Sequence, residues 1–289
     1  MTYATILAVV DGTEGGEAAL GAALALGERM KSRVELLHVE IDAEASVPVL
    51  GEGMSGAVVE QVIESLRSGA QQRLTRARQL YQDRVVDRGV ATAGPTAKPI
   101  AGQFTVVFDH AVGREADEVA RRGRLADLIV IGRPSPEGDG VLSPSLDAAL
   151  FDSGRPVLLV PPGQTAEFGK TVAIGWDRSR EAARAAAVAL PLLERAESVT
   201  VLTAREDDSG TEPSQLVKFL NGHGIEARTW AFVPDSGRIG EALLEQAGKA
   251  GADLLVMGAY SHSRLRELVL GGATRSVLRH ATLPVLMAH

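Results

Sequence analysis

The strongest constraint on the fold of this chain is an internal duplication. When residues 5–37 are laid over residues 171–203, a shift of 166 positions, ten of the 33 aligned residues are identical without a gap. Residues 126–132 (ADLIVIG) then match residues 252–258 (ADLLVMG) at five of seven positions, and the Pro-Val-Leu tripeptide that begins at Pro156 returns at Pro284. Three matching blocks in the same order predict two tandem copies of one fold.

The two copies differ in length between their second and third blocks. The alignment shift falls from 166 to 126, so the first copy carries about 40 extra residues, which we place within residues 42–101. The spacing of apolar residues predicts one helix in that stretch, from Val58 to Tyr81. The turn-rich stretch Pro161–Gly169 separates the copies, and we therefore expect domains at residues 1–163 and 168–289.

Each copy is predicted to contain five short buried strands that alternate with helices. Continuous runs of β-branched residues and leucine are typical of strands buried on both faces of a parallel sheet. The ten expected strands are Thr5–Val10, Val34–Val39, Phe104–Phe108, Leu128–Ile131, Val157–Val160, Thr171–Trp176, Val199–Thr203, Ala227–Phe232, Leu254–Met257 and Val285–Ala288. The predicted fold class is therefore α/β, with two tandem doubly wound, Rossmann-like parallel sheets of five strands each, built from right-handed βαβ units.

Composition and charge exclude several kinds of protein. The chain has no cysteine, which excludes disulfides and zinc or iron–sulfur sites with cysteine ligands. Its net charge of −7 argues against a nucleic-acid partner, and we interpret Arg121, Arg122 and Arg124 as the solvated end of a helix. The uncharged stretch from Ala18 to Gly27 is too short to span a membrane, and the N-terminus does not resemble a signal peptide. We expect a cytoplasmic protein with no membrane partner.

Candidate binding residues follow the predicted strands of the second copy. Ligands of doubly wound sheets bind beyond the carboxyl ends of the strands, where strand order reverses. Asp177 follows the first strand, and a loop from Gly258 to Thr274 follows the fourth, with Gly271 and Gly272 near its end. Glycine amides and a helix N-terminus suit a phosphate, and a carboxylate can accept hydrogen bonds from ribose or adenine. By themselves these glycines equally indicate a tight strand exit and a helix start, and Asp177 equally indicates a helix N-cap.

The segment from Ala252 to His289 resembles the C-terminal signature of the universal stress protein family. The earlier ADLIVIG copy, and an aspartate after the first strand of both copies (Asp11 and Asp177), extend the resemblance over nearly the whole chain. The chain is therefore similar to tandem two-domain members of that family. The resemblance further implies that the last strands of the two copies pair across a pseudo-twofold axis and that the chain forms homodimers.

The resemblance also implies a binding site for ATP, with Mg²⁺, in the second copy. ATP-binding members have a pattern of Gly, two residues, Gly, nine residues, Gly, then Ser or Thr. Here these positions hold Gly258, Ser261, Gly271 and Gly272, and Thr274 lies two residues further on. Ser261 adds a Cβ where a positive φ would favour glycine, at a cost on the order of 1 kcal/mol. Gly272 lacks the hydroxyl but keeps its N–H.

Two further positions complete the expected picture of the site. His262 lies in the same loop and either touches a phosphate or is simply solvated. In the first copy Asp11 and Gly132 are present, but the loop continues as Arg133-Pro134-Ser135-Pro136. Proline has no backbone N–H to offer an anion. We therefore predict that the first copy does not bind a triphosphate.

Motifs for several enzyme classes are missing from the chain. It contains no GxxxxGK[ST] phosphate loop, no GxGxxG that opens a helix after a strand, no HExxH and no GxSxG. We therefore expect no enzyme. The resemblance implies a non-catalytic stress-response protein that binds an adenine nucleotide. Two alternatives stay open: a nucleotide-free interaction or scaffold protein, and a weak adenine-nucleotide hydrolase.

Overall fold

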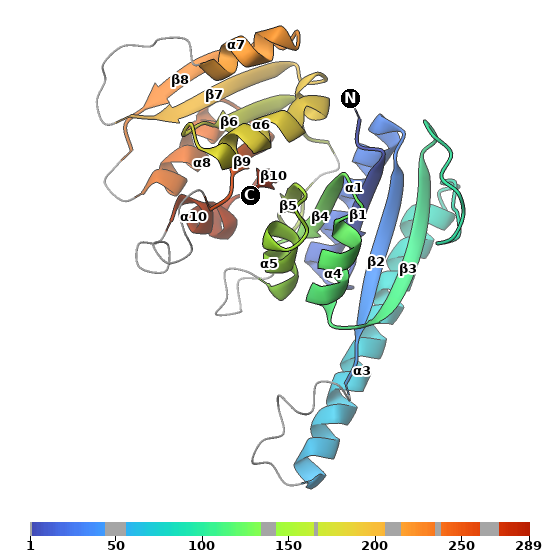
Figure 1. The fold of residues 1–289 in the computed structure, drawn as a ribbon. Helices are drawn as coiled ribbons and strands as arrows, with labels where there is room; N and C mark the ends of the chain where they lie inside the picture. Colours follow the sequence, from blue (N-terminus) through green and yellow to red (C-terminus); the bar gives the residue numbers. More distant parts are fainter. Residues whose placement is uncertain are drawn as a thin grey trace.

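One ten-stranded sheet with helices on both faces forms the body of the protein (Figure 1). The computed structural model describes residues 2–43, 56–133, 143–164, 167–205, 215–234, 238–260 and 272–289. The strand order is β3-β2-β1-β4-β5-β10-β9-β6-β7-β8. Neighbouring strands are parallel at every junction except the central one, between β5 and β10.

The same succession of strands and helices occurs in both halves. The first half contains β1 (Thr5–Val9), α1 (Glu14–Met30), β2 (Arg33–Ile41), α3 (Gly56–Tyr81), the π-helix η1 (Gln82–Val86), β3 (Thr105–Gly113), α4 (Glu115–Gly123), β4 (Leu128–Gly132), α5 (Pro144–Phe151) and β5 (Val157–Val160). The second half contains β6 (Thr171–Gly175), α6 (Arg180–Leu193), β7 (Ser198–Ala204), α7 (Gln215–Gly222), β8 (Arg228–Phe232), α8 (Ile239–Lys249), β9 (Leu254–Gly258), α10 (Ala273–His280) and β10 (Val285–Ala288).

The predicted fold class is confirmed, because each of the ten expected strands overlaps one observed strand. The largest difference is β3, which continues to Gly113 instead of ending at Phe108. It continues because β2 runs on to Ile41, and the two strands stay paired from Arg33 with Thr105 to Ile41 with Gly113. The extension therefore depends on a neighbouring strand, which the apolar run at Phe104–Phe108 could not reveal.

The expected pairing of the two last strands is confirmed at the centre of the sheet. Val285, Leu286 and Met287 of β10 lie opposite Leu159, Leu158 and Val157 of β5 in antiparallel register. The order within each half, counted outward from this junction, is the same, so the halves are related by a pseudo-twofold axis between β5 and β10.

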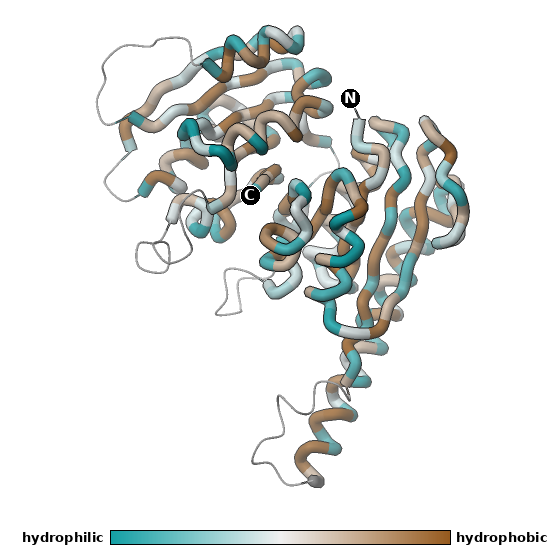
Figure 2. The backbone as a smooth tube through the Cα atoms, viewed as in Figure 1, coloured by the Kyte–Doolittle hydropathy of each residue, from teal (hydrophilic) through white to brown (hydrophobic). Residues whose placement is uncertain are grey.

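Two hydrophobic cores, one on each face of the sheet, run through both halves. Side chains from α1, α3, α6 and α7 pack on one face, and side chains from α4, α5, α8 and α10 pack on the other. Successive residues of β5 and β10 alternate between the cores, as expected for strands buried on both sides. In Figure 2, brown stretches along β2 and β7 mark apolar residues in two further strands of the sheet.

The repeated aspartate of the ADLIVIG and ADLLVMG segments holds the start of the first strand in each half. Asp127 accepts hydrogen bonds from the backbone N–H groups of Ala4 and Thr5, and Asp253 accepts them from Gly169, Lys170 and Thr171. Both copies thus keep a contact between the start of the fourth strand and the start of the first. The sequence pattern alone did not reveal that the repeated aspartate makes this contact.

Helix α3 confirms the helix expected at Val58–Tyr81 and lies in the extra stretch of the first half. Ala70, Leu74 and Ala77 in its C-terminal part are buried against the sheet. Its N-terminal part extends beyond the body of the protein, as Figure 1 shows. Only its C-terminal part therefore covers the sheet.

A glycine at the end of the fourth strand lets the first helix of each half approach closely. A Cβ on Gly132 would lie 1.9 Å from the carbonyl oxygen of Gly15 at the start of α1. A Cβ on Gly258 would lie 2.5 Å from the backbone nitrogen of Ala182 and 2.7 Å from the carbonyl carbon of Glu181 in α6. Both glycines are therefore required by backbone packing, whatever else they do.

The substitution Gly132→Ala is expected to lower the free energy of unfolding by about 1–3 kcal/mol, because backbone atoms cannot move aside as a flexible side chain can. Gly248→Ala in α8 is the matched control, since its added Cβ would meet nothing within 4 Å. That control should be neutral or stabilising by about 0.4–1 kcal/mol. Urea unfolding of both variants measures the difference, and equal stability would contradict the packing argument.

Candidate functional site

The candidate site lies at the carboxyl ends of β6 and β9, where the chain order of the second half reverses. From β6 the sheet continues to β7 and β8 on one side and to β9 and β10 on the other. The equivalent position in the first half lies between β1 and β4. Loops that leave two such strands diverge to opposite faces of the sheet, and the resulting crevice is where ligands of doubly wound folds bind.

Asp177 lies in a tight turn between β6 and α6, with an exposed side chain. Its Oδ1 accepts a hydrogen bond from the N–H of Ser179 at 2.9 Å, and Arg178 between them has a left-handed φ of 67°. Ser179 is the N-cap of α6, because its hydroxyl accepts from the N–H of Ala182 at 3.1 Å. The interpretation of Asp177 as that N-cap is therefore wrong: Asp177 fixes the turn, and Ser179 caps the helix.

Gly272 and Thr274 lie at the start of α10. Gly272 is the N-cap and has no side chain to satisfy the first N–H groups of the helix. Thr274 is buried, and its Oγ1 accepts a hydrogen bond from the N–H of Tyr260 at 3.2 Å. The threonine hydroxyl thus joins α10 to the residue that follows β9, and the amides of the first turn remain directed out of the helix N-terminus, where an anion is favoured.

The structure describes four of the seven predicted site residues. Asp177, Gly258, Gly272 and Thr274 are placed around the carboxyl ends of β6 and β9 and the N-terminus of α10. Ser261, His262 and Gly271 lie outside the described residues.

Sequence reasoning missed Thr203, near the end of β7. Its Oγ1 is buried and has no hydrogen-bond partner within the described part of the chain. The strand registers show that Thr203 corresponds to His38 of β2, because Thr171 pairs with Ser198 as Thr5 pairs with Arg33. The Nε2 of His38 is likewise buried and without a partner among described residues. No local motif marks either position; only the comparison of the registers reveals the equivalence.

At the equivalent position of the first half, helix α3 and a hydrogen-bonded turn approach the end of β1. Helix α3 lies against the turn after β1, so that a Cβ on Gly12 would come within 2.6 Å of the carbonyl oxygen of Arg73. Asp11 accepts hydrogen bonds from both the N–H and the hydroxyl of Thr13, at 3.0 and 2.7 Å. The carboxylate of Asp11 is thus already engaged within its own turn.

Several titratable groups gather in this first-half crevice. Burial raises the pKa of Glu115 above its usual value, although its side chain accepts a hydrogen bond from Ser145. His110 lies 2.9 Å from Glu40, measured from Nε2 to Oε2, in a half-buried ion pair. The rings of His38 and His110 are 6.0 Å apart. The crevice is polar, and its groups are paired mainly with one another.

Burial also governs the charge state of His38, whose side chain is only 2% exposed. Its Nδ1 donates a hydrogen bond to the carbonyl of Val10 at 2.7 Å, since a carbonyl can only accept. Loss of hydration lowers the pKa of His38 first of all, and the nearby charges of His110 and Arg73 lower it further. The Val10 carbonyl and Asp11 oppose this shift. The neutral imidazole is therefore the folded form.

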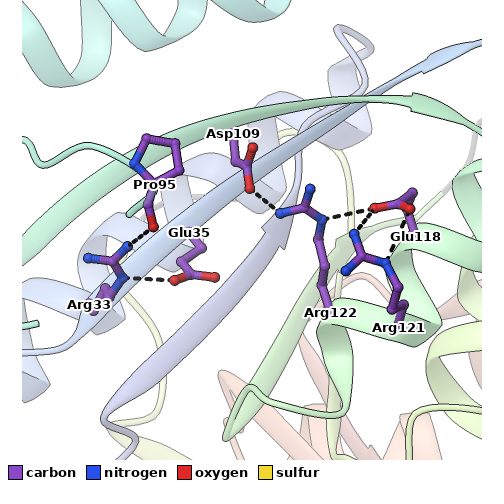
Figure 3. A network of polar contacts seen from close by, with 7 residues as sticks. All are labelled: Arg33, Glu35, Pro95, Asp109, Glu118, Arg121 and Arg122. Atoms are coloured by element: carbon purple, nitrogen blue, oxygen red, sulfur yellow. Dashed lines mark hydrogen bonds and ion pairs between the residues drawn. The ribbon is translucent and has the colours of Figure 1, made fainter. Parts of the chain in front are cut away.

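The basic residues of α4 are paired within the first half (Figure 3). Arg122 contacts Asp109 of β3 and donates to Glu118 at 3.0 Å, while Arg121 donates to the same carboxylate at 2.6 Å. Arg124 donates to the carbonyl of Asp152. In the same view, Arg33 bridges Glu35 and the carbonyl of Pro95. The arginines of this helix are therefore tied into local contacts.

Fold and site together define a tandem doubly wound α/β protein with a candidate anion cradle in its second half. Residues 169–289 match the model of the universal stress protein family. Over nearly its full length the chain is also similar to the universal stress protein Slr1230 of Synechocystis, 25% identical over 300 residues, which covers 97% of this chain and 98% of that protein.

Two solved structures share the complete two-half architecture. A universal stress protein from Archaeoglobus fulgidus aligns with a TM-score of 0.67 at 16% identity, covering 100% of this chain and 99% of that one. A protein of unknown function from Pseudomonas aeruginosa aligns with a TM-score of 0.55 at 16% identity, covering 98% and 92%. The family model thus matches the C-terminal half of the chain, and the similarity to full-length relatives extends over both halves.

The buried neutral state of His38 predicts a specific pH dependence of stability. The pKa of His38 is lower in the folded than in the unfolded protein, where it is about 6.5. The contribution of the neutral His38 to the free energy of unfolding is therefore fully present above pH 6.5 and is lost as the pH falls through the folded pKa. The variant His38→Thr, which installs the residue of the equivalent second-half position, should remove this loss. As the pH is lowered from 7.5 to 5, the free energy of unfolding should fall less steeply in this variant than in the unmodified protein. The two slopes should differ by up to about 1.4 kcal/mol per pH unit.

Urea unfolding at several pH values measures this difference in slope, which does not depend on how the substitution changes stability at pH 7.5. The exposed His223 provides the control, because His223→Thr should leave the pH dependence unchanged. Identical slopes for His38→Thr and the unmodified protein would contradict the assignment of a buried neutral imidazole.

Proposed function

We propose that this universal stress protein is a non-catalytic, stress-response protein that binds ATP or another adenine nucleotide in its C-terminal half. Three features of that crevice support the proposal. Asp177 offers an exposed carboxylate beside β6, Thr203 has a buried hydroxyl without a partner in the described chain, and α10 begins at Gly272, which has no side chain to cap the first N–H groups of the helix. They match the needs of a nucleotide: an acceptor for sugar or base hydroxyl and amino groups, and amides for phosphates.

The observation that carries the proposal is the contrast between the two crevices. In the first half, α3 lies on the turn after β1, and Asp11 accepts a hydrogen bond from the Thr13 hydroxyl in addition to the one from the Thr13 N–H. In the second half, Asp177 is exposed and accepts the equivalent hydrogen bond from the Ser179 N–H, without a second one from the Ser179 hydroxyl, which caps α6. The chain thus keeps the means to bind a nucleotide in one copy while the other copy is closed by its own residues.

Mg²⁺ belongs to this proposal as the companion of the nucleotide phosphates. Among the described residues no group of three or more His, Cys, Asp or Glu side chains is arranged to hold a metal ion. A bound Mg²⁺ would therefore take its ligands mainly from phosphate oxygens and water, as that ion commonly does.

The proposal also includes self-association into homodimers and a cytoplasmic location, both implied by the resemblance to the family. The helices in the described part of the chain lack the combination of length and apolarity that crossing a bilayer requires. The intramolecular pairing of β5 with β10 is already satisfied within one chain, so a homodimer would use another surface.

Thermal or chemical unfolding with added Mg·ATP tests the proposed binding. A ligand present at 100 times its dissociation constant should raise the free energy of unfolding by about 2.7 kcal/mol. No stabilisation at millimolar nucleotide would favour the nucleotide-free interaction protein instead. Release of phosphate in the same samples, lost on substitution of Asp177, would favour the weak hydrolase.

The duplication supplies a matched pair of variants for locating the site. Asp177→Asn keeps an oxygen for the Ser179 N–H but removes the charge and one acceptor, so nucleotide affinity should fall at least tenfold, or about 1.4 kcal/mol. Asp11→Asn makes the same change at the equivalent position of the first half and should leave affinity unchanged. Isothermal titration calorimetry measures both, and a loss of affinity confined to Asp11→Asn would place the nucleotide in the wrong half for this proposal.

A further inference from the structure

Each half of the protein contacts the loop that leaves the fourth strand of the other half. Arg133, directly after β4, donates hydrogen bonds to the carbonyl groups of Arg279 and Ala281 at the C-terminus of α10. Tyr260, two residues after β9, packs its ring on Phe151 at the C-terminus of α5. The two contacts occupy pseudo-symmetric places, because β4 and β9 both end in glycine and α5 and α10 both precede the last strand.

The contact to Tyr260 is part of a cluster of three rings. The centroids of Phe151 and Tyr260 are 5.1 Å apart, and those of Phe151 and His289 are 4.9 Å apart in an edge-to-face arrangement. The Nδ1 of His289 donates to the carbonyl of Ala259 at 3.0 Å, and the N–H of Ala259 donates to the carbonyl of Ala288 at 2.9 Å. Ring pairs of this kind stabilise a structure beyond the effect of their buried area.

Tyr260 is the residue that needs this support. It has a φ of 54°, in the left-handed region that is unfavourable for a residue other than glycine. Such a conformation persists only when surrounding contacts hold it in place. The described contacts come from two sides: Phe151 holds the ring, and Thr274 at the start of α10 accepts the backbone N–H.

Tyr260 thereby ties together the two elements that carry the candidate nucleotide site. It lies just beyond Gly258 at the end of β9, and its hydrogen bond reaches the first turn of α10, whose amides face the proposed phosphates. A change in the Tyr260 ring position would shift its N–H, and hence the first turn of α10 relative to β9. Phe151 is the residue of the other half that fixes that ring.

We propose that Phe151, in the first half, is a positioning residue for the nucleotide site of the second half, acting through Tyr260 and Thr274. This inference rests on the proposed function, since it concerns how the same crevice is held ready for its ligand. It also explains why a first half with a closed crevice still contributes to binding. The first half supplies the aromatic support for the loop of its partner half.

Two substitutions of Phe151 test the proposal against a control elsewhere. Phe151→Ala should weaken Mg·ATP binding about tenfold in isothermal titration calorimetry, and Phe151→Tyr, which keeps the ring, should restore the affinity of the unmodified protein. The control is Phe219→Ala in α7, whose ring contacts His223 directly after that helix. It should leave the affinity unchanged. Equal affinity in Phe151→Ala and the unmodified protein would overturn the proposal.

Amide hydrogen exchange in the absence of nucleotide gives a second, independent readout. In Phe151→Ala the N–H of Tyr260 should exchange at least tenfold faster, while the N–H of Val256 within β9 should keep its rate. A general loss of stability would accelerate both, so parallel acceleration, or an unchanged Tyr260 rate, would overturn the positioning role. If the unmodified protein itself fails to bind Mg·ATP, the proposed function is wrong, and the exchange rates alone decide whether Phe151 holds Tyr260.

Discussion

The antiparallel pairing of β5 with β10 is the interaction on which the rest of the structure depends. It joins two five-stranded parallel sheets into one, and it buries the edge strand that each half would otherwise expose. It also continues both hydrophobic cores from one half into the other, since Leu158 and Leu286 face one core and Val157 and Val285 face the opposite one. The two copies are therefore joined by a continuous sheet and by two shared hydrophobic cores.

The same pairing brings the functional ends of the two halves into contact. The loop after β4 reaches α10, and the loop after β9 reaches α5, because the pseudo-twofold axis runs between β5 and β10. The tandem arrangement thus gives each of these loops a contact from the other half, and this is why a change at Phe151 is expected to affect Thr274.

The duplicated elements retain their shared packing while the crevices have diverged. Gly132 and Gly258 both admit the first turn of a helix, and Asp127 and Asp253 both hold the start of a strand. At the equivalent positions His38 and Thr203, by contrast, one half has a buried imidazole among charged neighbours, and the other has a hydroxyl without a partner in the described chain. Packing constrains the backbone of both copies, whereas under the proposed function ligand chemistry would constrain only the second copy.

The sequence by itself determined the duplication, the ten strands and the α/β class, and the meeting of the last strands was implied by the family resemblance. The duplication, the strands and the class follow from local apolar runs and from a repeated order of motifs, which can be recognised without knowledge of distant contacts. Only the tertiary structure decided that Ser179 caps α6, that the Thr274 hydroxyl holds Tyr260, and that Phe151 packs on that ring. The Phe151 and Thr274 contacts join residues far apart in the chain. The cap depends on which of two nearby oxygens the folded turn directs at the helix. A local sequence pattern encodes none of these three contacts, because the partner of each side chain is set by the folded arrangement of the chain.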